Sequence, residues 1–322
     1  MIAILAKLGE LLKLIYSIGK YSYEFVDGWA KLPEGESFLD VCGIAIGRRD
    51  DVYVLNRSKH PVMVFDREGN SVSSWGEGYF GRAHGTCVGP DGSIYCTDDR
   101  SHIVTKFDAE GNILMVLGTK GKPSDTGYRE TSDHFESIAS IKRGGPPFNR
   151  PTGVTLSSSG EIYVSDGYGN ARIHKFGADG RLLLSWGEPG SGPGEFRLPH
   201  SVRVDACDRI WVSDRENSRI QVFNDRGEFL TQWTDLIRPT DLCIDDEVVY
   251  VSELCRRLSF FTMDGKLLAR WGNEGRDQKD PLFVAPHAIA VDSEGSLYVG
   301  EVAMTHSKVD RGSRTIQKFT RV

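Results

Sequence analysis

The chain has 322 residues, a net charge of −6 and a sequence pI near 5.8. This acidic balance argues against an electrostatic nucleic-acid binder, and no apolar stretch is long enough for a transmembrane segment. The six cysteines show no CxxC spacing, and buried free thiols favour a reducing compartment, so we expect a cytoplasmic protein.

Residues 1–20 are expected to form an amphipathic helix. Their apolar residues follow helical spacing, and three charged residues interrupt the apolar run that a signal peptide needs: Lys7, Glu10 and Lys13. We expect this helix to pack on the rest of the fold or at a subunit contact, where it would mediate self-association. Binding to a membrane surface is the alternative.

A six-fold repeat organises residues 21–322. An aromatic residue leads into a short segment with a polar end, and the gaps between these aromatics are 42, 68, 48, 39 and 48 residues. The six anchors are YVLN at 53–56, YCTD at 95–98, YVSD at 163–166, WVSD at 211–214, YVSE at 250–253 and YVGE at 298–301. Alternating strands and Gly or Asp turns surround each anchor. Four antiparallel strands per repeat are typical of a propeller blade, so we predict an all-β, six-bladed β-propeller of four-stranded blades.

Two further segments complete this prediction. The sixth repeat ends at Val322 after its third strand, and residues 21–29 (YSYEFVDGW) are predicted to close the last blade and remove an open edge. The long gap between the second and third anchors comes from residues 119–150, which are polar and rich in turns. We predict that they form an inserted loop on one face of the propeller, near the mouth of the site.

Three histidines share one position of the repeat: His84 in AHGTCV, His200 in PHSVRV and His287 in PHAIAV. They fall in every second blade, so they are predicted to converge near the axis, about 120° apart. Three imidazoles with open positions beyond them are the ligand set of a catalytic zinc site, and imidazole also suits other divalent transition metals. The remaining histidines are expected to be surface or packing residues: His60, His102, His134, His174 and His306.

Other polar residues lie where loops begin. The polar ends of the six anchors are expected mostly to cap loops by accepting backbone N–H groups, and some are candidates to hydrogen-bond a histidine's second ring nitrogen. Two loop residues, Arg57 and Tyr168, are candidates for catalysis. A tyrosine beside a dication can act as a base, and an arginine can hold a carboxylate or oxyanion. From the residues alone, a stacked surface tyrosine and a solvated arginine are the alternatives.

Four segments in order resemble a known family: SDGYGNARI, SWGEPGSGPGEFRLPHS, VSDRENSRIQVF and APHAIAVDSEGSLYVGE. They are similar to peptidyl-α-hydroxyglycine α-amidating lyase (peptidylamidoglycolate lyase), of the NHL-repeat propeller group. The resemblance covers about residues 40–322 and is densest at 148–223. It implies a six-bladed propeller with a zinc ion held by three histidines. It also implies an enzyme that cleaves a carbinolamide into an amide and glyoxylate.

The resemblance also implies roles for single residues. The family's zinc histidines match His84, His200 and His287, its catalytic tyrosine matches Tyr168, and its active-site arginine matches Arg57. Two features depart from the family. Ala288 replaces an acidic residue tied to a structural calcium, which puts calcium in doubt. A pair of half-cystines is replaced by Asn149 and Gly169, so that disulfide is absent.

Three functions therefore stand as hypotheses. The first is a metal-dependent carbon–nitrogen lyase that acts on a small-molecule α-hydroxyamide or hemiaminal. The second uses the same three histidines for a metal hydroxide, which would make the protein a hydrolase or hydratase of an ester, lactone or amide. The third is a non-enzymatic NHL scaffold that binds a protein partner.

Overall fold

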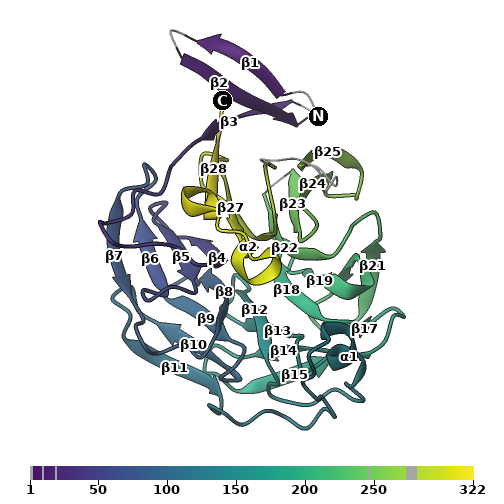
Figure 1. Cartoon of the computed structure of the whole chain (residues 1–322). Helices are drawn as coiled ribbons and strands as arrows, with labels where there is room; N and C mark the ends of the chain where they lie inside the picture. The colour runs from purple at the N-terminus through teal and green to yellow at the C-terminus, as the bar shows by residue number, and fades with distance from the viewer. Residues whose placement is uncertain (1–2, 9–10, 19, 246, 273–280) are drawn as a thin grey trace. The chain divides into compact units, whose positions relative to one another are not determined.

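The computed structural model describes residues 3–8, 11–18, 20–245, 247–272 and 281–322, and it consists mostly of strands (Figure 1). The prediction of a six-bladed β-propeller of four-stranded antiparallel blades is confirmed. The first five blades follow the chain in order: β4 (Val41–Ile46), β5 (Val52–Asn56), β6 (Val62–Phe65) and β7 (Ser71–Trp75); β8 (Ala83–Val88), β9 (Ile94–Asp98), β10 (Ile103–Phe107) and β11 (Ile113–Gly118); β12 (Pro151–Leu156), β13 (Ile162–Asp166), β14 (Arg172–Phe176) and β15 (Leu182–Trp186); β18 (Pro199–Val204), β19 (Ile210–Asp214), β20 (Arg219–Phe223) and β21 (Phe229–Trp233); β22 (Pro239–Ile244), β23 (Val248–Glu253), β24 (Arg257–Thr262) and β25 (Leu267–Gly272).

The sixth blade joins the two ends of the chain. It contains β26 (Pro286–Val291), β27 (Leu297–Glu301) and β28 (Ile316–Arg321), and β28 pairs antiparallel with β3 (Tyr21–Val26). β3 therefore occupies the fourth place in this blade, where it covers the backbone edge that β28 would otherwise leave open.

The helix predicted for residues 1–20 is wrong, because the structure has β1 (Ala3–Leu8) and β2 (Leu11–Ile18) here. These strands form a hairpin, and β2 pairs with the outer edge of β3. Tyr16 and Ile18 alternate with the exposed Ser17 and pack against Trp271 and Phe319. This period of two suits a strand, and pairing with an open sheet edge outweighs the helical spacing of the apolar residues.

The chain divides into two compact units, residues 75–241 and residues 1–74 with 242–322. In the first unit, the aromatic anchor of one blade packs against the next blade. Tyr163 of β13 belongs to one buried cluster with Val212 and Phe223, and the Trp186 ring lies 5.9 Å from that of Phe223. The aromatic residues of the repeat thus bury apolar surface between neighbouring sheets, and such burial is the main stabilising contribution in a fold of this kind.

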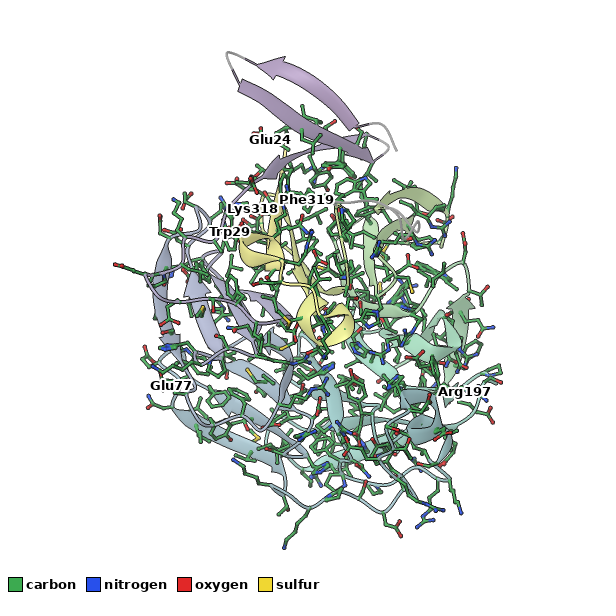
Figure 2. The ribbon with its side chains drawn as sticks, in the orientation of Figure 1. Glu24, Trp29, Glu77, Arg197, Lys318 and Phe319 are labelled. Carbon is green, nitrogen blue, oxygen red and sulfur yellow. The ribbon has the colours of Figure 1, made fainter. Side chains whose placement is uncertain are left out.

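In the second unit, neighbouring residues of β28 face opposite sides of their sheet. Phe319 joins a buried cluster with Trp271, whereas the ammonium of Lys318 lies over the rings of Trp29, at 6.0 Å, and Tyr298, at 5.1 Å. Lys318, Phe319 and Trp29 are labelled in Figure 2. Aromatic side chains therefore cover both faces of this strand. Phe319 packs among apolar residues on one face, and the side chain of Lys318 lies against two aromatic rings on the other.

The connections between strands carry the few helices. Residues 119–150 link β11 to β12 and contain α1 (His134–Ala139). The other short elements are α2 (Ala303–Ser307), the 3₁₀ turns η1 (Arg215–Asn217) and η2 (Gly312–Thr315), and the paired strands β16 (Glu188–Pro189) and β17 (Glu195–Phe196). Within the described ranges, every helix is too short to cross a lipid bilayer.

Candidate metal centre

Each of the three histidines is the second residue of the first strand of its blade, in β8, β18 and β26. The pairing of each strand with its neighbour shifts register at this residue. Pro199 pairs with Asp214 and Ser201 with Ser213, so His200 has no partner of its own in the ladder. The same irregularity surrounds His84 and His287. A β-bulge re-aims side chains within it, and in all three blades the irregular stretch includes the histidine.

The hydrogen bonds of the three rings follow one rule. In each histidine, Nδ1 contacts a backbone carbonyl of the equivalent position in the next blade: Thr152 O at 2.7 Å for His84, Thr240 O at 2.6 Å for His200 and Cys42 O at 2.9 Å for His287. A carbonyl oxygen only accepts, so we assign the hydrogen to Nδ1 in each neutral ring. Each Nε2 atom then carries the lone pair that a metal ligand needs.

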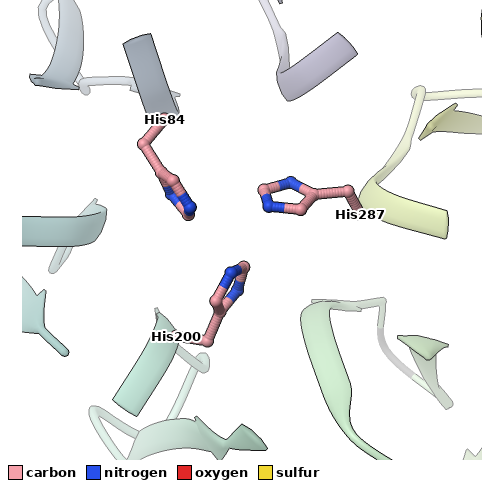
Figure 3. A group of neighbouring side chains, drawn as sticks. All are labelled: His84, His200 and His287. Atoms are coloured by element: carbon pink, nitrogen blue, oxygen red, sulfur yellow. The ribbon is translucent and has the colours of Figure 1, made fainter. Parts of the chain in front are cut away.

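Figure 3 shows the three imidazole rings pointing toward one another. Their ligand atoms all lie within 4.8 Å of one another, and all three side chains are buried. Three neutral imidazoles, with their tautomers fixed by backbone carbonyls, fit a divalent transition metal with positions left for other ligands. The donor set suits zinc, and it also suits iron, cobalt, nickel or copper.

The carboxylates at the anchor ends hold the backbone just before each histidine. Asp98 accepts from the backbone N–H groups of Gly81 and Arg82, at 2.6 and 2.9 Å, and Asp214 accepts from that of Arg197 at 2.8 Å. Glu301 does the same for Val284 and Ala285. The predicted loop-capping role is therefore correct for these anchors. The alternative, that they bond the histidines' second nitrogen, is wrong because backbone carbonyls take that place.

Tyr168 points its hydroxyl group at the imidazoles. Its oxygen lies 3.1 Å from Nε2 of His84 and 3.5 Å from Nε2 of His200, and Nη1 of Arg215 donates to it at 3.4 Å. Tyr168 therefore adjoins the nitrogen atoms that would bind a metal.

Three guanidinium groups surround the Tyr168 ring, at 5.3 Å for Arg82 and 5.5 Å for both Arg150 and Arg215. Burial would lower the pKa of Arg215, but the negative charges of Tyr168, when ionised, and of Glu216 raise it above the usual value. Arg215 thus stays a cation beside the Tyr168 hydroxyl.

The loop that carries Tyr168 has no room for a side chain at Gly167 or Gly169, the residues on either side of it. A Cβ atom on Gly167 would meet the carbonyl oxygen of Pro199 at 2.2 Å, and one on Gly169 would meet Oδ1 of Asn149 at 2.2 Å. The N–H of Gly169 donates to Asn149 O at 3.0 Å, so the two positions expected to lack a disulfide are neighbours joined by the backbone. All six cysteines are free.

Arg57 follows β5 and lies in the unit of residues 1–74 and 242–322. Its Nη1 atom is 3.4 Å from Oδ2 of the buried Asp40 and 3.4 Å from Oγ1 of Thr305, and Thr305 also donates to Asp40. Asp40 therefore fixes Arg57 against α2. A catalytic role for Arg57 remains a prediction.

Sequence reasoning missed two residues near Tyr168. Arg215 directly follows the anchor WVSD, at the repeat position that Arg57 has after YVLN, so the same argument applied to it. His134 was expected to be a surface or packing residue, but its ring lies 6.3 Å from that of Tyr168. Its segment has no repeat position, so no sequence signal marked it. Ala288, expected to weaken a calcium site, is buried among apolar residues and offers no ligand atom.

Known proteins share both the repeat and the fold of this chain. The NHL repeat matches residues 148–176 and 196–223, which agrees with a propeller built from such repeats. Streptogramin B lyase superposes with a TM-score of 0.60 over 95% of this chain and 100% of that protein, at 14% identity, which shows the fold alone.

The chain belongs to the NHL-repeat family of NHL repeat-containing protein 3. It is 30% identical to the mouse protein over 313 residues, which cover 91% of this chain and 82% of that protein. A protein of Drosophila melanogaster named peptidyl-α-hydroxyglycine α-amidating lyase 2 is 27% identical over 270 residues, covering 77% of this chain and 59% of that lyase. The resemblance to amidating lyases is therefore confirmed at moderate identity.

Proposed function

We propose that the protein is a metal-dependent lyase that cleaves the carbon–nitrogen bond of a small α-hydroxyamide, as peptidylamidoglycolate lyases do. The observation that carries this proposal is the position of Tyr168, whose hydroxyl lies 3.1 Å from Nε2 of His84 and 3.5 Å from Nε2 of His200. A base is needed at this place because the substrate's hydroxyl must lose its proton near the metal.

His84, His200 and His287 would hold the metal, which we propose to be zinc. When bound, this ion would supply a Lewis acid that makes a neighbouring hydroxyl group more acidic. Tyr168 as phenolate would take the hydroxyl proton, and the surrounding guanidinium groups would stabilise the phenolate before it does so.

Arg215 and Arg57 are the candidates to hold the carboxylate beside the reacting carbon. Arg215 is buried and donates to Tyr168, so a carboxylate bound to it would lie within reach of the same oxygen. Once the hydroxyl proton is removed, the oxygen forms a carbonyl group and the carbon–nitrogen bond breaks. The products are a primary amide and glyoxylate, or the corresponding oxo acid.

Turnover of N-benzoyl-α-hydroxyglycine, measured as glyoxylate release by zinc-loaded protein, tests this function. We expect Arg57→Ala to reduce turnover by about 10²-fold or more while metal content is retained. Unchanged turnover in Arg57→Ala would remove this residue from the reaction.

A binding role is the second candidate, because the mouse relative is named only for its repeats. A scaffold needs no metal ligands, so metal content separates the two functions. The free cysteines are consistent with a cytoplasmic location, which we also propose.

A further inference from the structure

His134 reaches the candidate site from outside the repeat. It is the first residue of α1, within the connection of residues 119–150. Its ring is edge-on to that of Tyr168, at a centroid distance of 6.3 Å and an angle of 71°. The side chain is about one-third exposed, at 37%, so it is neither a core residue nor a freely solvated one.

A buried carboxylate holds one of its nitrogens. Nε2 of His134 lies 3.1 Å from Oε1 of Glu216. Burial alone would raise the pKa of Glu216, but the hydrogen bond with His134 and the charges of Arg215 and Arg238 hold it well below its usual range. Glu216 is therefore an anion that only accepts hydrogen bonds, which places a hydrogen on Nε2 of His134.

Arg215 is a second neighbour of the same nitrogen, with Nη2 at 3.0 Å from Nε2 of His134. A guanidinium only donates, so a hydrogen bond from Arg215 would need a lone pair on Nε2 of His134, whereas a hydrogen bond to Glu216 needs a hydrogen there. We assign the hydrogen to Nε2 because Arg215 has other acceptors. Its Nε donates to Glu216 at 2.8 Å and its Nη1 to Tyr168 at 3.4 Å.

The second nitrogen of His134 is available for chemistry. Across the ranges that the structure describes, no residue hydrogen-bonds to Nδ1 of His134. A carboxylate that orients one ring nitrogen while the other faces a reactant is the usual arrangement of a histidine acid or base.

A hollow lies beside α1, next to the carboxylate that contacts His134. It has a volume of about 460 Å³, and Glu216 forms part of its wall together with apolar side chains that include Phe135, Ile138, Phe196 and Leu198. An apolar group on the amide side of a substrate would fit this hollow, whose wall includes the Glu216 carboxylate that contacts His134.

We infer that His134 is the general acid of the lyase reaction, an inference that rests on the proposed function. An amide anion is a strong base and a poor leaving group, so its nitrogen needs a proton as the carbon–nitrogen bond breaks. Tyr168 takes the proton of the α-hydroxyl, the bonding pair moves to nitrogen, and the His134 imidazolium donates its Nδ1 proton there. Transfer of the proton on Tyr168 to His134, through water, restores both groups.

The test is the effect of His134→Gln on a series of N-(substituted benzoyl)-α-hydroxyglycines whose leaving benzamides differ in acidity. The variant should lose about 10²-fold or more in kcat with the least acidic amide, and the loss should shrink as acidity rises. Zinc content and thermal unfolding should match the wild type, because His134 contacts no proposed metal ligand among its hydrogen-bond partners. Glu136→Gln, an exposed change on the same helix, should behave as the wild type throughout.

The outcomes are separable. A loss of equal size across the whole series, or no loss, would overturn the assignment of His134 while leaving the lyase function in place. A wild-type protein that holds zinc but converts no member of the series would overturn the proposed function and this inference together.

Discussion

Replacing Tyr168 with Phe removes one oxygen atom from the candidate site. That oxygen contacts Nε2 of His84 at 3.1 Å, Nε2 of His200 at 3.5 Å and Nη1 of Arg215 at 3.4 Å. These contacts are long for hydrogen bonds, so their loss should cost about 1 kcal/mol of folding stability or less. If the hydroxyl is the general base, however, kcat should fall by about 10²- to 10⁴-fold, which corresponds to about 3–5 kcal/mol of the activation barrier.

Glyoxylate release from N-benzoyl-α-hydroxyglycine measures this change, beside zinc content and thermal unfolding of the same preparations. We expect a large loss of kcat in a folded protein that keeps its metal. A variant whose kcat stays within about threefold of the wild type would refute the role of Tyr168, since general-base catalysis is worth far more than that.

Three further outcomes follow from the structure. Gly167→Ala should destabilise the protein by about 1–3 kcal/mol in urea unfolding, because the new Cβ atom would meet Pro199 O at 2.2 Å. The control Gly192→Ala should cost much less, because its Cβ atom would meet only the end of a side chain at 3.2 Å. Desolvation raises the pKa of the Cys87 thiol to about 12, so at pH 8 it stays protonated, and alkylation followed by peptide mapping should label the exposed Cys207 well before Cys87. In ¹⁸O-labelled water, lyase chemistry should leave the newly formed carbonyl unlabelled when it is trapped at once, whereas a hydrolase would place solvent oxygen in its product.

The repeat explains how much of the fold the sequence predicts. The six anchors recur at equivalent positions, so the blade count, the strand order and the convergence of His84, His200 and His287 follow from one pattern. The β-bulge at each histidine does not follow from it, because a bulge depends on how two strands pair rather than on either strand alone.

Segments outside the repeat were predicted least well. Residues 3–8 and 11–18 pair as two strands because the outer edge of β3 is open to pairing, a tertiary effect that helical periodicity in a single segment does not report. His134 lies in the connection of residues 119–150, where no equivalent positions exist for comparison. Arg215 is different: it has the same repeat position as Arg57, so the pattern contained this signal.

Metal analysis determines whether His84, His200 and His287 bind an ion. Wild-type protein, purified without added metal and then loaded with zinc and dialysed, would be compared with two variants, His200→Ala and His60→Ala. The ring of His60 has contacts that include Ser74 and Glu36. We expect about one metal ion per chain in the wild type and in His60→Ala, and a loss of most of it in His200→Ala. Absence of metal from the loaded wild type, or equal retention in all three proteins, would contradict a three-histidine metal centre.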